Sequence, residues 1–392
     1  MKYIKLATFL ILMFLSFVLP SNIQVVKYVL LSIIIAIGTF EYVIFGKEGK
    51  FLLSHTFDTA IIFTTLGLFF LTEGIFNGFS VLRTVNFYIV YPLLFCWLFF
   101  SMSDVIKFKY VDSVIIIAFS FTAGIFLLYL TGVSFEIFKG HDGIQNSDGF
   151  VKYSFVFFSF WVFSIPYILT RVFYSQLGSI KKTFLYFLLL LFGLLCGRKA
   201  ILLNVLALNL IFILISIKSK KNVLIILLNM IFLLLFINFF LGYLLMGFDF
   251  YNATNISAYT RTLQFNGLLR TIWEYPIFGV GLAGISEYYQ RDDPLNPFAY
   301  ELYYLSLIMW FGIIGFLLYS INFCRIIYYS FICYISYANS EHKKYFYPII
   351  VGLFSFLIAS GTNPYFAKFD SMWYVFMVVL YSDITYRKKI NE

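Results

Sequence analysis

The chain has 392 residues, of which 61% are hydrophobic and only 12% are charged, and its mean hydropathy is +0.90. A soluble domain of this length cannot carry such a composition on its surface, so a polytopic membrane protein is predicted. The net charge of +9 could suit nucleic acid, but most basic residues fall in connections predicted below to be cytoplasmic, which leaves a nucleic-acid partner without support. Aromatic residues make up 22%. Most Phe is expected to face lipid, and an aromatic-lined cavity is the alternative.

Cysteine and histidine give no sign of a disulfide framework or a metal site. The four cysteines lie within or at the ends of apolar runs without paired spacing, at Cys96, Cys196, Cys324 and Cys333. The three histidines fall in separate connections, at His55, His141 and His342. Neither set has the spacing of a metal-ligand motif. A metal-independent protein without a cofactor is therefore expected.

Twelve apolar runs are long enough to cross, or nearly cross, a bilayer. The first follows Lys2 and Lys5 and resembles a signal peptide, but no small-residue cleavage site follows it, so it is predicted to be a retained span. The predicted spans are 6–20, 25–45, 57–71, 84–100, 113–131, 151–170, 183–197, 200–217, 223–242, 299–323, 345–361 and 370–386.

Basic residues in alternate connections predict the orientation, because cytoplasmic loops are rich in Lys and Arg. With the N-terminus inside, the two sides carry 18 and 10 basic residues, and three of the ten lie in one long loop that the rule does not count. Both termini are therefore predicted to be cytoplasmic. Only three of the 18 inner residues are Arg, against five of the ten outer ones. Because Arg grips phosphate bidentately, this bias favours an anionic ligand outside, although chance is a fair competitor with so few arginines.

The predicted architecture is all-α and divides into three parts. Residues 1–242 hold nine spans, 243–298 form one large periplasmic loop, and 299–392 hold three spans and a cytoplasmic tail. A structureless loop as long as 243–298 is improbable unless it is functional. A shorter outer connection is expected at 132–150. The sequence shows neither internal repeats nor an appended soluble domain.

A helix is predicted inside the long loop, capped by Ser257 or Thr260 and ended before Pro276. At 100° per residue, Arg261 and Arg270 lie on nearly opposite sides of it. The two arginines therefore do different jobs, unless the helix bends. For Arg270, a salt bridge to the residue four positions on, worth about 0.3–0.5 kcal/mol, is the alternative to ligand binding.

The loop continues with glycines and tyrosines that predict a substrate-contacting segment. Gly279 and Gly281 belong to a G-x-G-x-x-G pattern, but no strand precedes it and a nicotinamide cofactor is not expected outside the cell, so dinucleotide binding is rejected. The glycines either let amides approach a phosphate or let the loop re-enter the membrane, and a simple turn is equally consistent. Tyr288 and Tyr289 suit sugar rings, though membrane interfaces also collect tyrosine.

Two charged positions lie at predicted outer membrane edges. Glu301 begins an apolar span, on a face expected to continue through Tyr304 to Gly315. An isolated carboxylate there has a raised pKa unless a cation is near, which suits a general base; a water-exposed interfacial residue is the alternative. Arg198 and Lys199 lie in a tight turn on the predicted outer side of the membrane, where the charge rule disfavours basic residues. A cation retained there needs a partner, and lipid headgroups are the simplest one.

The order of these features resembles the O-antigen polymerase and O-antigen ligase superfamily of bacterial envelope glycosyltransferases. In that superfamily a Gly/Ser-Arg-x-Ala-x-Leu segment opens a middle span, as at 197–202. A large periplasmic loop follows, with ten residues between an Arg and a Gly, as between Arg270 and Gly281, and with a Pro-x-x-Gly-x-Gly stretch that ends at this Gly. The next span carries His or Glu at its head and a later Gly-Ile-Ile-Gly, as at Glu301 and 312–315. The resemblance covers about 190–330.

The resemblance implies a GT-C-like, inverting glycosyltransferase of the bacterial inner membrane, active at the periplasmic face on undecaprenyl-diphosphate-linked oligosaccharide. Arg198 and Arg270, with Arg261 as a further candidate, would bind the diphosphate, and Glu301 would be the base. Membrane lipids and a chain-length regulator protein are the other partners that it suggests.

Three rival functions remain. Ligases of the superfamily carry His where this chain has Glu301, so a polymerase is favoured over a ligase that transfers polysaccharide to lipid A-core. A lipid-linked oligosaccharide flippase would spread its charges along many helices around a central cavity, rather than gather them in one loop. A small-solute transporter would show inverted repeats, which this sequence lacks.

Overall fold

The computed structural model describes residues 1–20, 22–45, 54–76, 85–103, 105–133, 135–147, 150–173, 179–195, 250–289, 300–337, 340–361 and 368–391. Its elements are α1 Lys2–Val18, α2 Gln24–Phe45, α3 Ser54–Phe76, η1 Asn86–Val90, α5 Tyr91–Met102, α6 Phe108–Leu130, η2 Glu136–Phe138, β1 Lys139–Ser147, β2 Phe150–Phe155, α7 Phe158–Phe173, α8 Ser179–Leu195, α11 Phe250–Glu274, α12 Tyr303–Ile332, η3 Cys333–Tyr337, α13 Ser340–Ser360, η4 Phe369–Ser371 and α14 Met372–Asn391. The predicted spans 200–217 and 223–242 lie outside the described residues.

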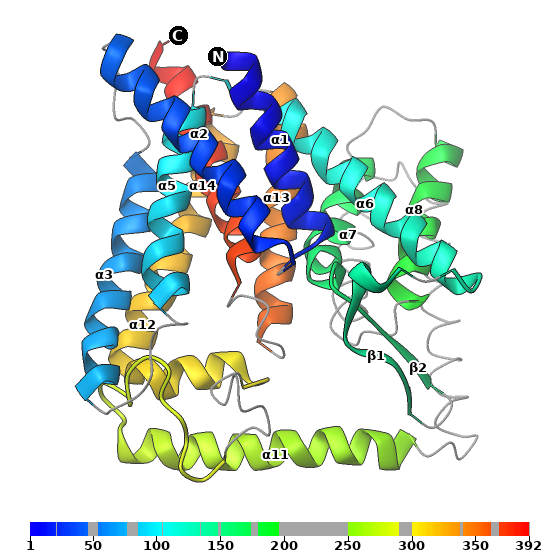
Figure 1. Cartoon of the computed structure of the whole chain (residues 1–392), viewed down its shortest axis with the longest axis vertical. Coiled ribbons are helices and arrows are strands. Elements are labelled where there is room, and N and C mark those ends of the chain that lie inside the picture. The colour runs from blue at the N-terminus through cyan, green and yellow to red at the C-terminus, as the bar shows by residue number, and fades with distance from the viewer. Residues whose placement is uncertain are drawn as a thin grey trace.

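The helices form a bundle with both chain ends at one end of it (Figure 1). Helix α11 lies across the opposite end, nearly perpendicular to the rest. This arrangement agrees with the predicted topology, in which the long loop and the termini are on different sides of the membrane. Within the described residues, four helices are long and apolar enough to cross a bilayer: α2, α3, α6 and α12 with its extension. Shorter apolar helices include α7 and the combined η1 and α5.

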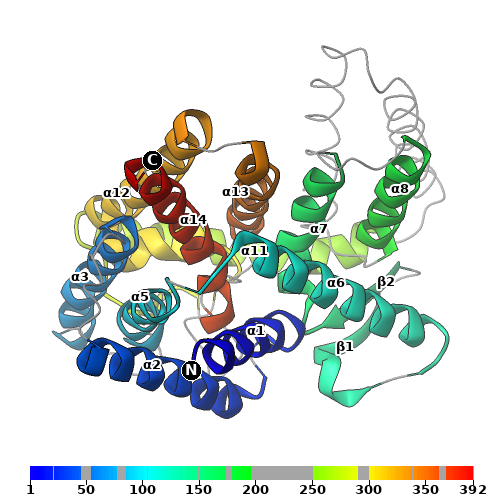
Figure 2. The same cartoon turned by 90° about the horizontal axis from the view of Figure 1, so that it is seen from above.

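Helix α14 is the centre of the bundle (Figure 2). From Met372 to Tyr386 nearly all of its side chains are buried, and its aromatic rings contact rings of several other helices. The Tyr374 ring stacks on Phe163 with centroids 4.5 Å apart, and Trp373 meets Phe95 edge-on at 5.1 Å. Among the described residues, more Phe side chains are buried than exposed. The expectation that most Phe faces lipid is therefore wrong for this part of the chain, because the rings fill the spaces between helices.

A buried ion pair closes the outer end of this core. The Nζ atom of Lys27, in the first turn of α2, lies 2.8 Å from Oδ1 of Asp370 in η4, and the two side chains are 0% and 2% exposed. Lys27 also donates to the carbonyl of Leu19 at 2.7 Å. A charge withdrawn from water this completely needs a partner, so the pair fixes α2 against the start of α14.

The structure departs from the all-α prediction at one place. The antiparallel strands β1 and β2 form a hairpin, in which Gln145 pairs with Lys152 and Ser147 with Phe150. The hairpin occupies the predicted outer connection 132–150 and the first residues of the predicted span 151–170. Residues 151–155 alternate aromatic or β-branched residues with Lys152 and Ser154, which suits a strand. They were predicted as part of a span because a long apolar run follows them directly.

Candidate functional site

Helix α11 presents one face to the bundle and the other away from it. Its buried side chains include Gln264, Leu268 and Thr271, which are spaced three or four residues apart. The helix is continuous from Phe250 to Glu274, so the predicted helix is present and begins earlier than expected. Because it does not break at Gly267, the two arginines remain on different sides, as their spacing predicts.

Arg261 and Glu301 form the ion pair at the centre of the candidate site. The Nε atom of Arg261 lies 3.0 Å from Oε2 of Glu301, and the side chains are 37% and 33% exposed. The backbone amide of Glu301 donates to the side-chain oxygen of Gln264 at 3.2 Å. Gln264 lies three residues after Arg261, so neighbouring positions on α11 hold both the carboxylate and the backbone of Glu301. The partial exposure leaves this pair accessible to a ligand.

Glu301 precedes α12 instead of opening it. The helix begins at Tyr303, so the prediction of one helical face from Glu301 through Tyr304 is wrong. Tyr300, on the other side of Glu301, is 1% exposed, and its hydroxyl accepts from the amide of Ser286 at 2.8 Å. Burial raises the pKa of Tyr300 to about 12. A neutral, buried tyrosine and the Gln264 contact therefore fix the backbone that leads into Glu301.

Arg270 lies away from the ion pair, on the exposed side of α11. Its guanidinium carbon lies 5.6 Å from the centroid of the Tyr288 ring, and the Tyr288 hydroxyl donates to Glu274. The hydrogen bond to Glu274, followed by the charge of that carboxylate, raises the pKa of Tyr288. In this described segment Arg270 and Glu274 form no direct ion pair. The Tyr288 side chain joins them instead, through its cation–π contact to Arg270, so the salt bridge given above as the alternative to ligand binding is not formed within the described residues.

Residues 279–284, called the glycine segment below, pack against α12 through their backbone. The amides of Val280 and Gly281 donate to the carbonyls of Met309 and Trp310 at 2.9 and 3.0 Å, and the amide of Leu282 donates to Phe70 of α3 at 3.0 Å. These amides are occupied by carbonyls, so the structure does not support a phosphate cradle here. The loop instead packs against α12 and α3.

The same contact explains a break in α12. Gly312 has φ 61° and ψ −176°, a conformation that is open almost only to glycine. The break frees the carbonyls that the loop amides bind, and the amide of Ile313 donates to Pro276 at 2.9 Å. Gly279, with φ 72°, lies so close that an added Cβ would be 2.5 Å from the Gly312 nitrogen. Glycines on both segments therefore permit this backbone approach.

The break turns the outer part of α12 across the end of the bundle. In Figure 1 this part, in yellow, lies near α11, and the rest of α12 runs along the bundle. The Trp310 indole nitrogen donates to the carbonyl of Gly284 at 2.9 Å, and the Tyr303 hydroxyl lies 3.0 Å from that of Tyr88. These contacts hold Tyr303, and with it the nearby Glu301, between α11 and the membrane helices.

The structure brings together only some of the predicted site residues. Arg261 and Glu301 are in contact, whereas Arg270 and Tyr288 form a separate pair on the exposed side of α11. The ring centroid of Tyr289 lies 6.4 Å from that of Tyr300. Arg198 and its motif at 197–202 lie outside the described residues. Gln264 was not predicted as a site residue. Its position three residues after Arg261, on the same side of the predicted helix, was the signal that could have identified it.

Residues 184–320 match the model of a family described as O-antigen ligase. The resemblance to the O-antigen polymerase and ligase superfamily is thereby confirmed over this stretch. The match includes Arg261, Gly281, Glu301 and Gly312, and therefore both the ion pair and the broken helix. No curated protein matched the chain.

The family match fixes the function only coarsely. The family covers both polymerase and ligase activity and is glycosyltransferase-like. Together with the apolar helices, it indicates a membrane protein of surface-glycan synthesis. The matched region includes the partly exposed ion pair of Arg261 and Glu301.

Proposed function

We propose that the protein is a polymerase of the O-antigen type in the bacterial inner membrane. It transfers a growing glycan from undecaprenyl diphosphate onto a new lipid-linked repeat unit at the periplasmic face. The accessible ion pair of Arg261 and Glu301, within the family-matched stretch and at the end of the bundle away from the termini, is the observation that carries this proposal.

The reaction needs a base and a means of stabilising the leaving group. The acceptor hydroxyl attacks the anomeric carbon as the bond from that carbon to the diphosphate oxygen breaks, with inversion. Glu301 takes the hydroxyl proton, and undecaprenyl diphosphate leaves with the electron pair. The Oε2 atom of Glu301 accepts a hydrogen bond from Arg261. Within the described residues the other carboxylate oxygen, Oε1, accepts none, so it is available for that proton.

Cations stabilise the diphosphate, and neither a metal ion nor a cofactor is invoked. Arg261 is next to the carboxylate and has further N–H donors beyond the one that it gives to Glu301. It is therefore the first candidate for the leaving group, ahead of Arg270, and this order reverses the one that the motif spacing suggested. Arg198 is retained as a further candidate from the resemblance alone.

Ligation to lipid A-core is the second candidate function, because the matched family is described as O-antigen ligase. Purified protein in proteoliposomes, supplied with a synthetic undecaprenyl-diphosphate-linked repeat unit, separates the two. A ladder of lipid-linked products from the repeat unit alone supports the polymerase. Transfer that occurs only when lipid A-core is added identifies a ligase, and no transfer under either condition contradicts both.

A further inference from the structure

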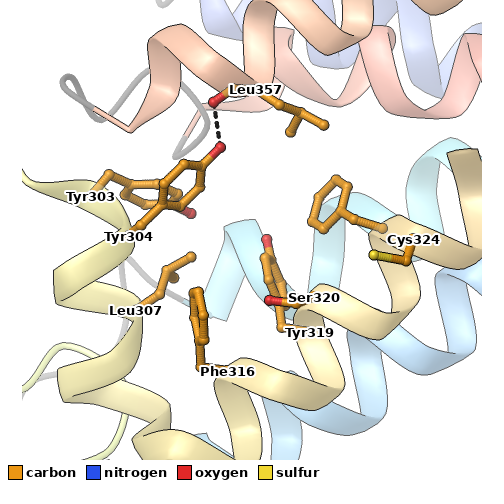
Figure 3. Close-up of a pocket in the computed structure, with 9 residues that line it drawn as sticks. Tyr303, Tyr304, Leu307, Phe316, Tyr319, Ser320, Cys324 and Leu357 are labelled. Carbon is orange, nitrogen blue, oxygen red and sulfur yellow. Dashed lines mark hydrogen bonds between the residues drawn. The ribbon is translucent and has the colours of Figure 1, made fainter.

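A pocket of about 270 Å³ lies in the angle of the broken helix α12 (Figure 3). Residues from both parts of α12 line it, and one residue of α13 closes it. The lining residues are Tyr303, Tyr304, Leu307, Phe316, Tyr319, Ser320, Phe323, Cys324 and Leu357. The pocket exists because the helix turns at Gly312. The same break lets the amides of Val280 and Gly281 bind α12, so one contact shapes both features.

The lining is suited to an apolar ligand. Aromatic rings and aliphatic side chains make up most of it, and two of its tyrosine hydroxyls already have partners. The Tyr303 hydroxyl pairs with that of Tyr88, and the Tyr304 hydroxyl donates to the carbonyl of Leu357 (Figure 3). A pocket with so little polar surface excludes sugars and phosphates and favours a hydrocarbon chain.

The pocket lies close to the charged site along the chain. Tyr303, which lines the pocket, follows Glu301 by two residues, and Glu301 pairs with Arg261. From there the lining extends along α12 to Cys324, twelve residues beyond Gly312 and therefore about 18 Å along the helix. A ligand that fits both regions has an anionic head and a long apolar tail.

We propose that this pocket holds the head-proximal isoprene units of the polyprenyl tail of the lipid-linked substrate. The assignment rests on the proposed function and deepens it, because it names where the lipid half of the donor or acceptor binds. A tail held there places the diphosphate beside Arg261. A phospholipid acyl chain is the competing occupant, and the experiment distinguishes the two.

Site-specific photo-crosslinking of the full-length protein tests the occupant. p-Benzoylphenylalanine replaces Phe323, which lines the pocket, and in a matched control it replaces Ile321, which is 60% exposed on the same helix. The probe is undecaprenyl diphosphate without sugar, in phosphatidylethanolamine and phosphatidylglycerol vesicles. We expect polyprenyl adducts at position 323 and mainly phospholipid adducts at 321. Phospholipid adducts alone at 323, or equal polyprenyl adducts at both positions, overturn the proposal.

Filling the pocket gives a second, kinetic test. Cys324→Trp places a large ring in the pocket, and Ile321→Trp places the same ring outside it. If the tail loses contact with about two methylene groups, the KM for the lipid-linked donor rises about tenfold in Cys324→Trp, with kcat retained. Equal KM values in the two variants contradict the tail site.

The two proposals fail in different ways. A polyprenyl adduct at position 323 in a protein that transfers no glycan supports the tail site and contradicts the proposed function. Glycan transfer by wild-type protein, with no polyprenyl adduct at 323, retains the proposed function and contradicts the tail site.

Discussion

Replacing Gly312 with alanine tests whether the contact between the glycine segment and α12 builds the site. An added Cβ would lie 2.1 Å from the carbonyl oxygen of Ile277, and φ at this position is 61°. That backbone conformation costs a residue other than glycine about 1–3 kcal/mol. Relief of the clash would also disturb the two loop amides bound to Met309 and Trp310, each worth about 1 kcal/mol. A destabilisation of about 3–5 kcal/mol is therefore expected for Gly312→Ala.

Thermal unfolding in detergent, followed by loss of the monodisperse peak in size-exclusion chromatography, measures this effect. Gly124→Ala is the matched control, because Gly124 lies within α6 and an added Cβ there meets nothing within 4 Å. Alanine in a helix interior is favoured over glycine by about 1 kcal/mol, so the control is expected to unfold at or slightly above the wild-type temperature. If Gly312→Ala unfolded at the same temperature as Gly124→Ala, the reasoning about the broken helix would be refuted.

Two further predictions concern charges. Lys27→Met removes the buried cation beside Asp370 and is expected to destabilise the protein by about 3–5 kcal/mol in the same unfolding assay. Adding Asp370→Asn to this variant should recover part of the lost stability. Additive losses from the two changes would contradict the pairing of these charges. If Arg270 binds diphosphate, Arg270→Ala is expected to abolish polymer synthesis and Arg270→Lys to support it poorly, while Glu274→Ala leaves it largely intact. Equal losses from the two alanine variants, read from product ladders, would instead indicate a structural unit of Arg270, Tyr288 and Glu274.

Local patterns predicted the helices but not how they meet. Apolar runs identified the described membrane helices to within about five residues at each end, except at the start of α7 and the end of α12. The 100° rule separated Arg261 from Arg270. Both inferences depend only on nearby sequence. The hairpin at 139–155 was missed because its second strand leads almost directly into the apolar run that forms α7, and the two were predicted as one span. The break at Gly312 requires a contact with a segment about thirty residues earlier, which periodicity along one helix cannot reveal.

The candidate site was only partly predictable for the same reason. Glu301 was identified from its position at an apolar boundary, and that part of the prediction needed no tertiary information. Its partner was not identified, because the motif spacing favoured Arg270 and only the packing of α11 turns Arg261 toward the carboxylate. The aromatic pocket depends on the angle of α12, so its lining residues looked like ordinary membrane-helix residues.

The role of Glu301 as the base is the central claim, and Glu301→Gln tests it most directly in proteoliposomes with a lipid-linked repeat unit. The amide keeps the size of the side chain and its ability to accept from Arg261, but it cannot take a proton at neutral pH. Glu287→Gln is the matched control, since Glu287 is an exposed carboxylate of the same outer segment. We expect Glu301→Gln to unfold at the wild-type temperature and to bind the lipid-linked substrate, but to slow polymerisation by about 10²–10⁴-fold and leave single repeats. Glu287→Gln is expected to form the full ladder. Polymerisation by Glu301→Gln at near the wild-type rate would contradict the account.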